Sequence, residues 1–262
     1  MNTLRRIPAV FAFEWRRALT IPRMGWMLAL AALPPLLLFL IRMAARSDPP
    51  PDVAAGLVYV LSPCVACMMS VFLWSTPAVS SELEGRSWTY LSVRPHGTLA
   101  VLLGKYLVGV SWALPVGLLS AIIGSLVITQ NDLPRLIATQ CALATLSCVA
   151  YGAVFLLIGV IAPARAMVLG VIYAIVFEVA AAFIPAAINL LTIQHRLRCL
   201  LVRWMGMDMS IAEESPVLLA YFGEESAAWH VFLLIVMTAG YLVVAALLLR
   251  YREFTAAAET AT

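Results

Sequence analysis

One acid stands out among the side chains of this sequence that could do chemistry. Glu178 lies near the middle of residues 166–191, which are otherwise almost entirely apolar. If that run crosses a membrane, the acid costs about 3 kcal/mol to insert, and about a dozen aliphatic and aromatic residues at about −0.3 to −0.6 kcal/mol each offset it. Glu178 is then either an ion or proton site or a buried group hydrogen-bonded to a neighbouring helix or loop. We favour the hydrogen bond.

Other reactive residues do not form a known constellation. Cys64 and Cys67 make a C-x-x-C motif, but Pro63 and apolar neighbours surround it, which favours helix packing over redox or metal chemistry. A phosphate-binding loop is absent, because Leu99 stands where its first glycine is required before Gly104-Lys105. Two glutamate pairs resemble those of intramembrane CAAX-type proteases, yet neither is followed by that family's arginine: Glu213-Glu214 and Glu224-Glu225.

A short polar segment, residues 80–95, has the pattern of a capped helix. Ser81 and Glu84 have capping-box spacing, and Pro95 should end the helix. The apolar residues form one stripe: Leu83, Trp88 and Leu91. Such a helix between two membrane spans is a candidate docking element. The pattern alone, however, favours a solvated loop whose aromatic residues rest at the lipid interface.

The composition defines the elements that must position these residues. The 262 residues are 63% hydrophobic and only 12% charged, and the mean hydropathy is +0.96. These values exclude an intrinsically disordered chain, a disulfide mini-protein and an ordinary soluble enzyme, and they indicate an integral membrane protein. The net charge of +3 includes no dense basic run, so we expect no nucleic-acid partner. We expect residues 1–262 to form a single transmembrane domain, because no stretch between the apolar runs could hold a soluble one.

Six apolar runs are long enough to cross the hydrocarbon core as helices: about 24–42, 55–78, 99–128, 136–161, 166–191 and 228–249. The third run, at about 30 residues, must tilt or project past the bilayer. Prolines inside the runs imply packing against other helices, which re-satisfies the backbone. Four glycines in the third run indicate close helix approach: Gly104, Gly109, Gly117 and Gly124.

The distribution of basic residues predicts the orientation. A cytoplasmic amino terminus places 11 of the 17 basic residues inside: Arg5, Arg6, Arg16, Arg17, Arg23, Arg86, Arg94, Lys105, Arg165, Arg250 and Arg252. It leaves six outside: Arg42, Arg46, Arg135, Arg196, Arg198 and Arg203. Both termini and residues 79–97 are therefore expected in the cytoplasm, and residues 192–227 form an exterior loop.

Two further helices are predicted outside the spans. Residues 1–22 have the pattern of a helix lying in the cytoplasmic interface, with apolar residues at helical spacing: Ile7, Val10, Phe11, Trp15, Ala18 and Leu19. The alternative is that this segment acts only as an orientation signal. In the exterior loop, a second stripe predicts another interfacial helix: Leu197, Leu200, Leu201 and Trp204. The expected fold is an all-α integral membrane protein of six transmembrane helices, with an N-terminal interfacial helix and short exterior helices between the fifth and sixth spans.

The stretch from Glu82-Leu83-Glu84-Gly85 through Pro95 to Leu102-Leu103-Gly104-Lys105-Tyr106 resembles the membrane subunits of type-2 ABC exporters. That family has an acidic residue and a glycine after the second span, then a short helix, a proline and a similar opening of the third span. Arg86 replaces the threonine often seen after the glycine. Glu178, Pro185 and His195-x-x-Arg198 are similar to that family's fifth-span ending.

The resemblance implies the permease of an exporter in the prokaryotic inner membrane, which pairs with a second copy or a homologue and with two ABC ATPase subunits. Residues 82–91 would be the coupling helix that binds the ATPase: Glu82, Leu83, Glu84, Gly85, Trp88 and Leu91. ATP would bind the partner, so this chain would be no enzyme and would need no cofactor or metal. Membrane lipid would surround it.

Two other classes stay open. An ATP-independent channel or secondary carrier would use Glu178 as its ion-coupling site, and an intramembrane hydrolase is less well supported. Copurification with an ATPase separates the ABC permease from both. The substrate is not determined by the sequence, because many lipid-linked, peptide or drug-like cargoes suit an apolar pathway.

Overall fold

The computed structural model describes residues 7–45, 49–80, 97–129, 132–180, 192–207 and 225–251. Within these ranges all the regular elements are helices. Five helical segments are long and apolar enough to cross a membrane. These are α2 (Ile21–Ala45), the segment Pro51–Ala78, α7 (Gly97–Ile128), α8 (Leu133–Ile161) and α13 (Ala227–Tyr251).

The second of these segments is built from four successive pieces: α3 (Pro51–Tyr59), the π-helical η2 (Val60–Ala66), α4 (Cys67–Ser75) and η3 (Thr76–Ala78). The run predicted as the fifth span, 166–191, begins with α9 (Ala166–Tyr173) and the π-helical η5 (Ala174–Ala180), and the short η4 (Pro163–Arg165) precedes it. The rest of that run lies outside the described residues, so a sixth span stays a prediction. The described residues also include two shorter helices, α1 (Ile7–Ala18) and α10 (Ile193–Met205).

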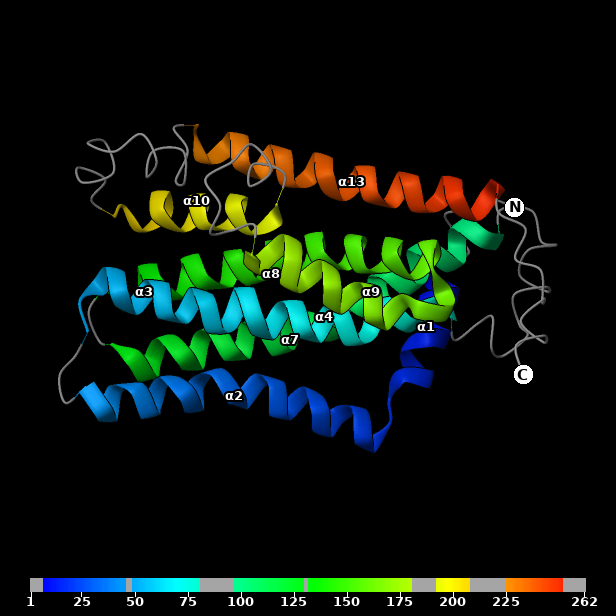
Figure 1. The fold of residues 1–262 in the computed structure, drawn as a ribbon. Coiled ribbons are helices and arrows are strands. Elements are labelled where there is room, and N and C mark those ends of the chain that lie inside the picture. Colours follow the sequence, from blue (N-terminus) through cyan, green and yellow to red (C-terminus); the bar gives the residue numbers. More distant parts are fainter. Residues whose placement is uncertain are drawn as a thin grey trace.

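The long helices lie side by side, with α2 and α13 on opposite edges of the bundle (Figure 1). Helix α1 and the last turn of α13 lie at one end, which we call the α1 end. Helix α10 lies at the other, beside the start of α3, and we call this the α10 end. Since both α1 and the end of α13 lie at the α1 end, the two ends of the described chain are on the same side of the bundle.

Helix α8 is the centre of the bundle and packs against α7, α4, α13, α10 and α9. Its largest fully buried side chains include Tyr151, Phe155, Leu143 and Leu156. Close approach is achieved with small residues, which is how helices associate in a lipid environment where apolar contact alone gives no advantage. A Cβ at Gly117 of α7 would collide with Cys67 of α4, so the close approach predicted from the glycines of this run is confirmed.

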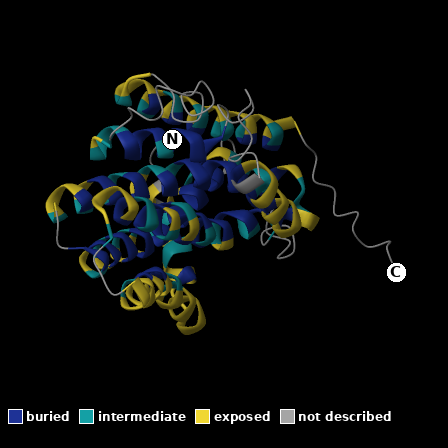
Figure 2. Ribbon diagram, turned by 60° about the vertical axis from the view of Figure 1, so that its left-hand side comes forward, coloured by how far each residue is buried: buried dark blue, intermediate teal, exposed yellow. Residues whose placement is uncertain are grey.

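The outer faces of α2 and α13 are apolar and exposed (Figure 2). Leu28 of α2 is 71% exposed and Ile235 of α13 is 59% exposed. A monomeric soluble protein rarely exposes such extended apolar faces. Lipid or a further membrane protein is the environment that suits them.

A proline is accommodated inside the second span by a π-helical turn and by side chains of α8. Pro63 is buried in η2, where it lacks the N–H that a helix would use. The hydroxyl of Ser147 donates a hydrogen bond to the carbonyl of Pro63 at 2.6 Å, and the Gln140 amide donates to the carbonyl of Ala55 at 2.8 Å. The expected packing of proline-containing spans against their neighbours is confirmed here.

Helix α10 differs from a simple interfacial helix. Its stripe residues Leu197, Leu200 and Leu201 are buried inside the protein, and so are His195 and Arg196. The helix packs against α8, α13 and α3, so it is part of the bundle. The amphipathic pattern of a sequence predicts a helix but not which helices will pack against it. Here the neighbouring helices also cover part of the polar face of α10.

Two arginines at the α10 end serve as caps of helix C-termini. Arg42 donates to the carbonyl of Val127 at 2.6 Å, near the end of α7. Arg135 donates to the carbonyl of Trp204 at 2.9 Å, at the end of α10. A cation is stabilised there by the last unpaired carbonyls and the helix dipole. These local contacts give a physical reason for two of the basic residues that the orientation count places outside.

Candidate functional site

The residues of the predicted coupling helix, 82–91, lie outside the described residues. Their helix and its contacts therefore stay predictions. The structure does describe both flanks of this segment, Ser80 after η3 and Gly97 at the start of α7. It also describes the surroundings of Glu178.

Glu178 lies buried in η5, with its side chain only 3% exposed. The carboxylate accepts hydrogen bonds from the hydroxyl of Tyr151 at 2.8 Å, the hydroxyl of Tyr173 at 2.5 Å and the backbone N–H of Gln194 at 3.0 Å. Three donors compensate much of the cost of removing a carboxylate from water. The geometry is that of the structural hydrogen-bonding group favoured by the sequence.

The Gln194 N–H is available because it belongs to the first turn of α10. Thr192 is the N-cap, and its hydroxyl oxygen accepts from the N–H of His195 at 3.1 Å. The Gln194 N–H has no partner within the helix, so the carboxylate of Glu178 supplies one. A negative charge at a helix N-terminus also interacts favourably with the dipole. Glu178 thus ties the fifth predicted span to α10.

The same place joins two further helices. The hydroxyl of Tyr59, at the end of α3, donates to the carbonyl of Gln194 at 3.2 Å. Tyr151 belongs to α8, and its hydroxyl group has one hydrogen to donate. The oxygen of Glu178 is nearer, at 2.8 Å, than the side-chain oxygen of Gln194, at 3.2 Å, so the hydroxyl donates to Glu178. The Glu178 site is therefore a junction of four segments.

A second polar site lies at the α1 end, where α1 binds α7. The ammonium group of Lys105 lies 3.6 Å from the carboxylate of Glu14, and these side chains are 6% and 17% exposed. Next to it, a Cβ at Gly104 would come within 2.7 Å of Val10 of α1. The hydroxyl of Tyr106 donates to the carbonyl of Val149 in α8 at 3.0 Å. The three consecutive residues Gly104-Lys105-Tyr106 thus hold α1, α7 and α8 together.

Aromatic rings reinforce this contact. Trp112 of α7 stacks on Trp15 of α1, with ring centroids 4.6 Å apart, and on Trp74 of α4, with centroids 5.3 Å apart. The guanidinium of Arg23 lies over the Trp74 ring, 4.9 Å from its centroid. Because Arg23 is exposed, this cation–π contact contributes about 0.5–1 kcal/mol. Helix α1 is therefore packed against the bundle by side chains from both its apolar and its polar positions.

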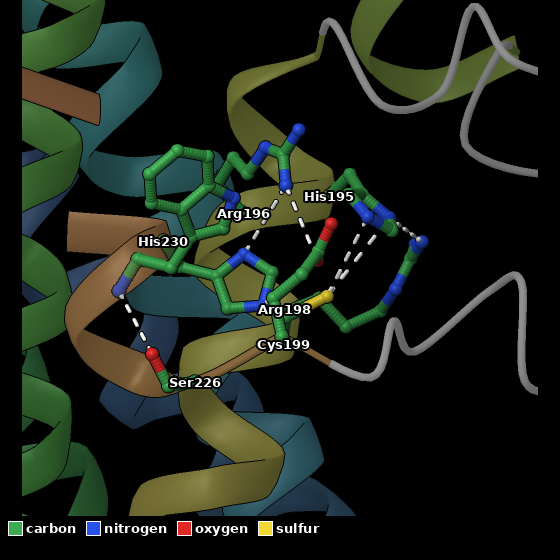
Figure 3. A network of polar contacts seen from close by, with 8 residues as sticks. His195, Arg196, Arg198, Cys199, Ser226 and His230 are labelled. Carbon is green, nitrogen blue, oxygen red and sulfur yellow. Dashed lines mark hydrogen bonds and ion pairs between the residues drawn. The ribbon is translucent and has the colours of Figure 1, made fainter. Parts of the chain in front are cut away.

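A third polar cluster joins α10 to the start of α13 (Figure 3). Arg196 lies 3.3 Å from Nδ1 of His230 and 3.6 Å from the carboxylate of Glu225. The ring of His195 also lies close to His230, with centroids 6.4 Å apart, and the thiol of Cys199 lies 3.6 Å from His195. Burial raises the pKa of the Cys199 thiol to about 11, so this thiol stays protonated at neutral pH. In the described part of the chain, no three His, Cys, Asp or Glu residues are grouped to hold a metal ion.

Sequence reasoning missed the Glu14–Lys105 pair and the joining of Arg196 to His230. A single charge in an amphipathic pattern gives no sign of its partner, which can lie on any neighbouring helix. The one available signal was Lys105, the only lysine of the chain, placed in an apolar run directly after a glycine. A charge at such a position needs a partner.

A comparison of the chain with models of protein families and with curated proteins finds no match.

Proposed function

We propose that this chain is the transmembrane permease subunit of an ABC transporter, an exporter driven by separate ATPase subunits. The observation that carries the proposal is the contact made by Gly104-Lys105-Tyr106. These residues belong to the stretch that resembles the type-2 exporters, and they fasten α1 and α8 to the first turns of α7. That is the position where a force received by residues 82–91 would enter the bundle.

The flanks of the proposed coupling helix support such a transfer. On one side, η3 packs against α8 and α9, and on the other side α7 packs against α1, α2 and α8. Residues 82–91 are thus connected at both ends to helices of the core. An ATPase bound there would move α4 and α7 together, since Trp74 and Trp112 stack across them.

The proposal includes a second permease copy or a homologue, the inner membrane of a prokaryote, and cytoplasmic termini. The exposed apolar faces of α2 and α13 leave room for lipid and for a second subunit. A carrier that uses Glu178 is the weaker candidate. Its carboxylate already accepts three hydrogen bonds from the protein, and a transported ion or proton would have to compete with them.

The test is copurification of the tagged, full-length chain from its native membrane with an ATPase, followed by the change Trp88→Ala. Aromatic anchors commonly contribute 2 kcal/mol or more to small interfaces, so affinity should fall by roughly 30-fold. ATP hydrolysis should then be uncoupled from transport. Ser81→Ala should weaken binding more mildly, by about 1 kcal/mol, through loss of the helix cap.

The matched control is Trp229→Ala. Trp229 is 46% exposed at the start of α13, at the α10 end of the bundle, so its loss should leave ATPase binding unchanged. Normal ATPase affinity and normal transport in Trp88→Ala would show that the docking assignment is wrong. Purification without any ATPase, together with ion-driven flux, would instead support the carrier.

A further inference from the structure

A cleft of about 420 Å³ opens at the α1 end, between α1, α2, α4 and α7. Its rim is charged and its walls are apolar. Three cations and one carboxylate contribute to the lining: Arg17, Arg23, Lys105 and Glu14. The apolar part includes Trp26, Met27, Leu30 and Leu73.

Both arginines of the lining come from helix ends, and this fixes their level in the bundle. Arg17 is in the last turn of α1 and Arg23 is in the first turn of α2, whereas Lys105 lies about two turns into α7 and pairs with Glu14. Leu30 lies two turns further along α2, toward the middle of the span. The cleft therefore has a cationic mouth at the expected membrane surface and an apolar interior directed toward the hydrocarbon core.

We propose that this cleft binds an anionic phospholipid, with the phosphate between Arg17 and Arg23 and an acyl chain along Leu30 and Leu73. The charge of the lining, three cations against one carboxylate, complements a phosphodiester. Arginine guanidinium groups pair with phosphate oxygens through two parallel hydrogen bonds, and Arg23 is positioned by its contact with the Trp74 ring. Basic pockets between helices on the cytoplasmic side are typical sites for anionic lipid headgroups.

A free phosphate would use only the mouth of the cleft. The apolar walls favour a lipid over a free phosphate, because they can contact an acyl chain but make no favourable contact with a small hydrophilic anion. The lipid would bridge α1 and α2 to α4 and so stabilise the packing of α1 on the bundle. The proposal rests on the cleft and on its expected cytoplasmic level, and it does not depend on an ATPase partner.

The test uses the full-length protein in nanodiscs of phosphatidylcholine. Dibrominated phosphatidylglycerol is titrated in, and quenching of tryptophan fluorescence is measured, since Trp26 and Trp74 line the cleft. Dibrominated phosphatidylcholine at equal mole fraction measures collisions with bulk lipid. Quenching by the anionic lipid should saturate at a low mole fraction and should exceed quenching by the neutral one. Glycerol phosphate in solution should not reverse it.

The variants are matched in charge and position. Arg17→Gln with Arg23→Gln should raise the mole fraction of half-saturation by roughly 30-fold, because each basic residue at a membrane surface strengthens anionic-lipid binding by roughly fivefold and the two losses multiply. Arg165→Gln with Arg250→Gln removes two exposed cations that are not in the lining, and it should change little. Arg17→Lys with Arg23→Lys keeps the charge but loses the paired guanidinium hydrogen bonds, so its half-saturation should lie between that of the parent protein and that of the Arg17→Gln, Arg23→Gln variant.

Three results would overturn the assignment. Equal quenching by the two lipids would show that no anionic lipid is selected. An equal loss of lipid binding in the Arg17→Gln, Arg23→Gln variant and in the Arg165→Gln, Arg250→Gln variant would show that the lipid is attracted to the charged surface in general. Reversal by glycerol phosphate would identify a site for soluble anions. Unfolding temperatures in pure phosphatidylcholine establish that the variants are folded, so that a loss of binding is attributed to the cleft.

Discussion

The carboxylate of Glu178 and the backbone N–H of Gln194 are joined by a hydrogen bond of 3.0 Å, which ties the π-helical turn of the fifth predicted span to the first turn of α10. The bond explains how an acid is tolerated in an apolar run. It satisfies a helix N–H that would otherwise be unpaired and buried, and the acid gains a donor in the same contact.

Glu178→Gln should therefore leave assembly and transport largely intact. Glutamine has nearly the same shape, its carbonyl oxygen can accept from Gln194, and its amide can donate to a tyrosine hydroxyl. Glu178→Leu removes every acceptor and should cost about 3 kcal/mol or more, because three donors lose their partner. The measurements are the thermal unfolding midpoint in detergent and transport in vesicles. Loss of transport in a normally assembled Glu178→Gln protein would favour an ion or proton role.

Gly104→Ala should loosen α1. The new Cβ would lie 2.7 Å from the stiff Val10 side chain. Overpacking of this kind costs about 1–3 kcal/mol, which outweighs the gain of about 1 kcal/mol from replacing a helical glycine. Unfolding should begin at a lower temperature, with a change in tryptophan emission as the Trp15–Trp112 stack opens.

Val10→Ala combined with Gly104→Ala should recover part of the lost stability, because it removes the methyl group at 2.7 Å and leaves only the Cβ of residue 10, at 3.1 Å. Gly240→Ala in α13 is the control, since a Cβ there meets nothing within 4 Å. If Gly104→Ala and Gly240→Ala behave alike, α1 does not pack on α7 as described.

The Glu14–Lys105 pair should show strong coupling in a double-mutant cycle. Lys105→Met and Glu14→Gln each leave one polar group poorly compensated, while the double variant leaves neither, so the effects should be non-additive by about 0.5–3 kcal/mol. Arg196–Glu225 is the comparison pair, and its glutamate is 42% exposed. Its coupling should stay below about 1 kcal/mol. Additive effects for Glu14 and Lys105 would mean that the ion pair contributes nothing to the docking of α1.

Topology is tested by cysteine labelling in intact cells. Asp132→Cys, in the exposed turn before α8, should react with a membrane-impermeant maleimide. Arg165→Cys, exposed at the other end of α8, should react only after the cells are opened. The reverse pattern would place α1 outside and overturn the orientation predicted from the basic residues.

Cys199 should stay unlabelled in the same experiment. Maleimide reacts with the thiolate, and burial raises the pKa of this thiol to about 11, so only a small fraction is ionised at pH 7.5. Reactivity should rise only as the pH approaches that value or when the protein unfolds. Rapid labelling of Cys199 in the native protein at neutral pH would mean that α10 is open to solvent.

The sequence by itself determined which segments form the long apolar helices. Apolar runs of sufficient length predicted the helices, because in lipid every backbone polar group must be satisfied within the segment. All five long helices correspond to predicted runs, with ends that differ by a few residues, as in α2 (Ile21–Ala45) against the predicted 24–42. Glycines of the third run predicted close approach, because only a missing side chain lets two backbones come together.

Tertiary structure alone decided which groups meet. No period in the sequence connects Glu178 to Tyr151 and Gln194, or Lys105 to Glu14, because each pair comes from different helices whose rotation is set by packing. The burial of His195 and Arg196 likewise depends on their neighbours, although their own helix reads as amphipathic. Hydrophobicity is a property of each single residue, so its pattern can be recognised in the sequence. A hydrogen bond or an ion pair between helices needs two groups held in position, and it exists only in the folded bundle.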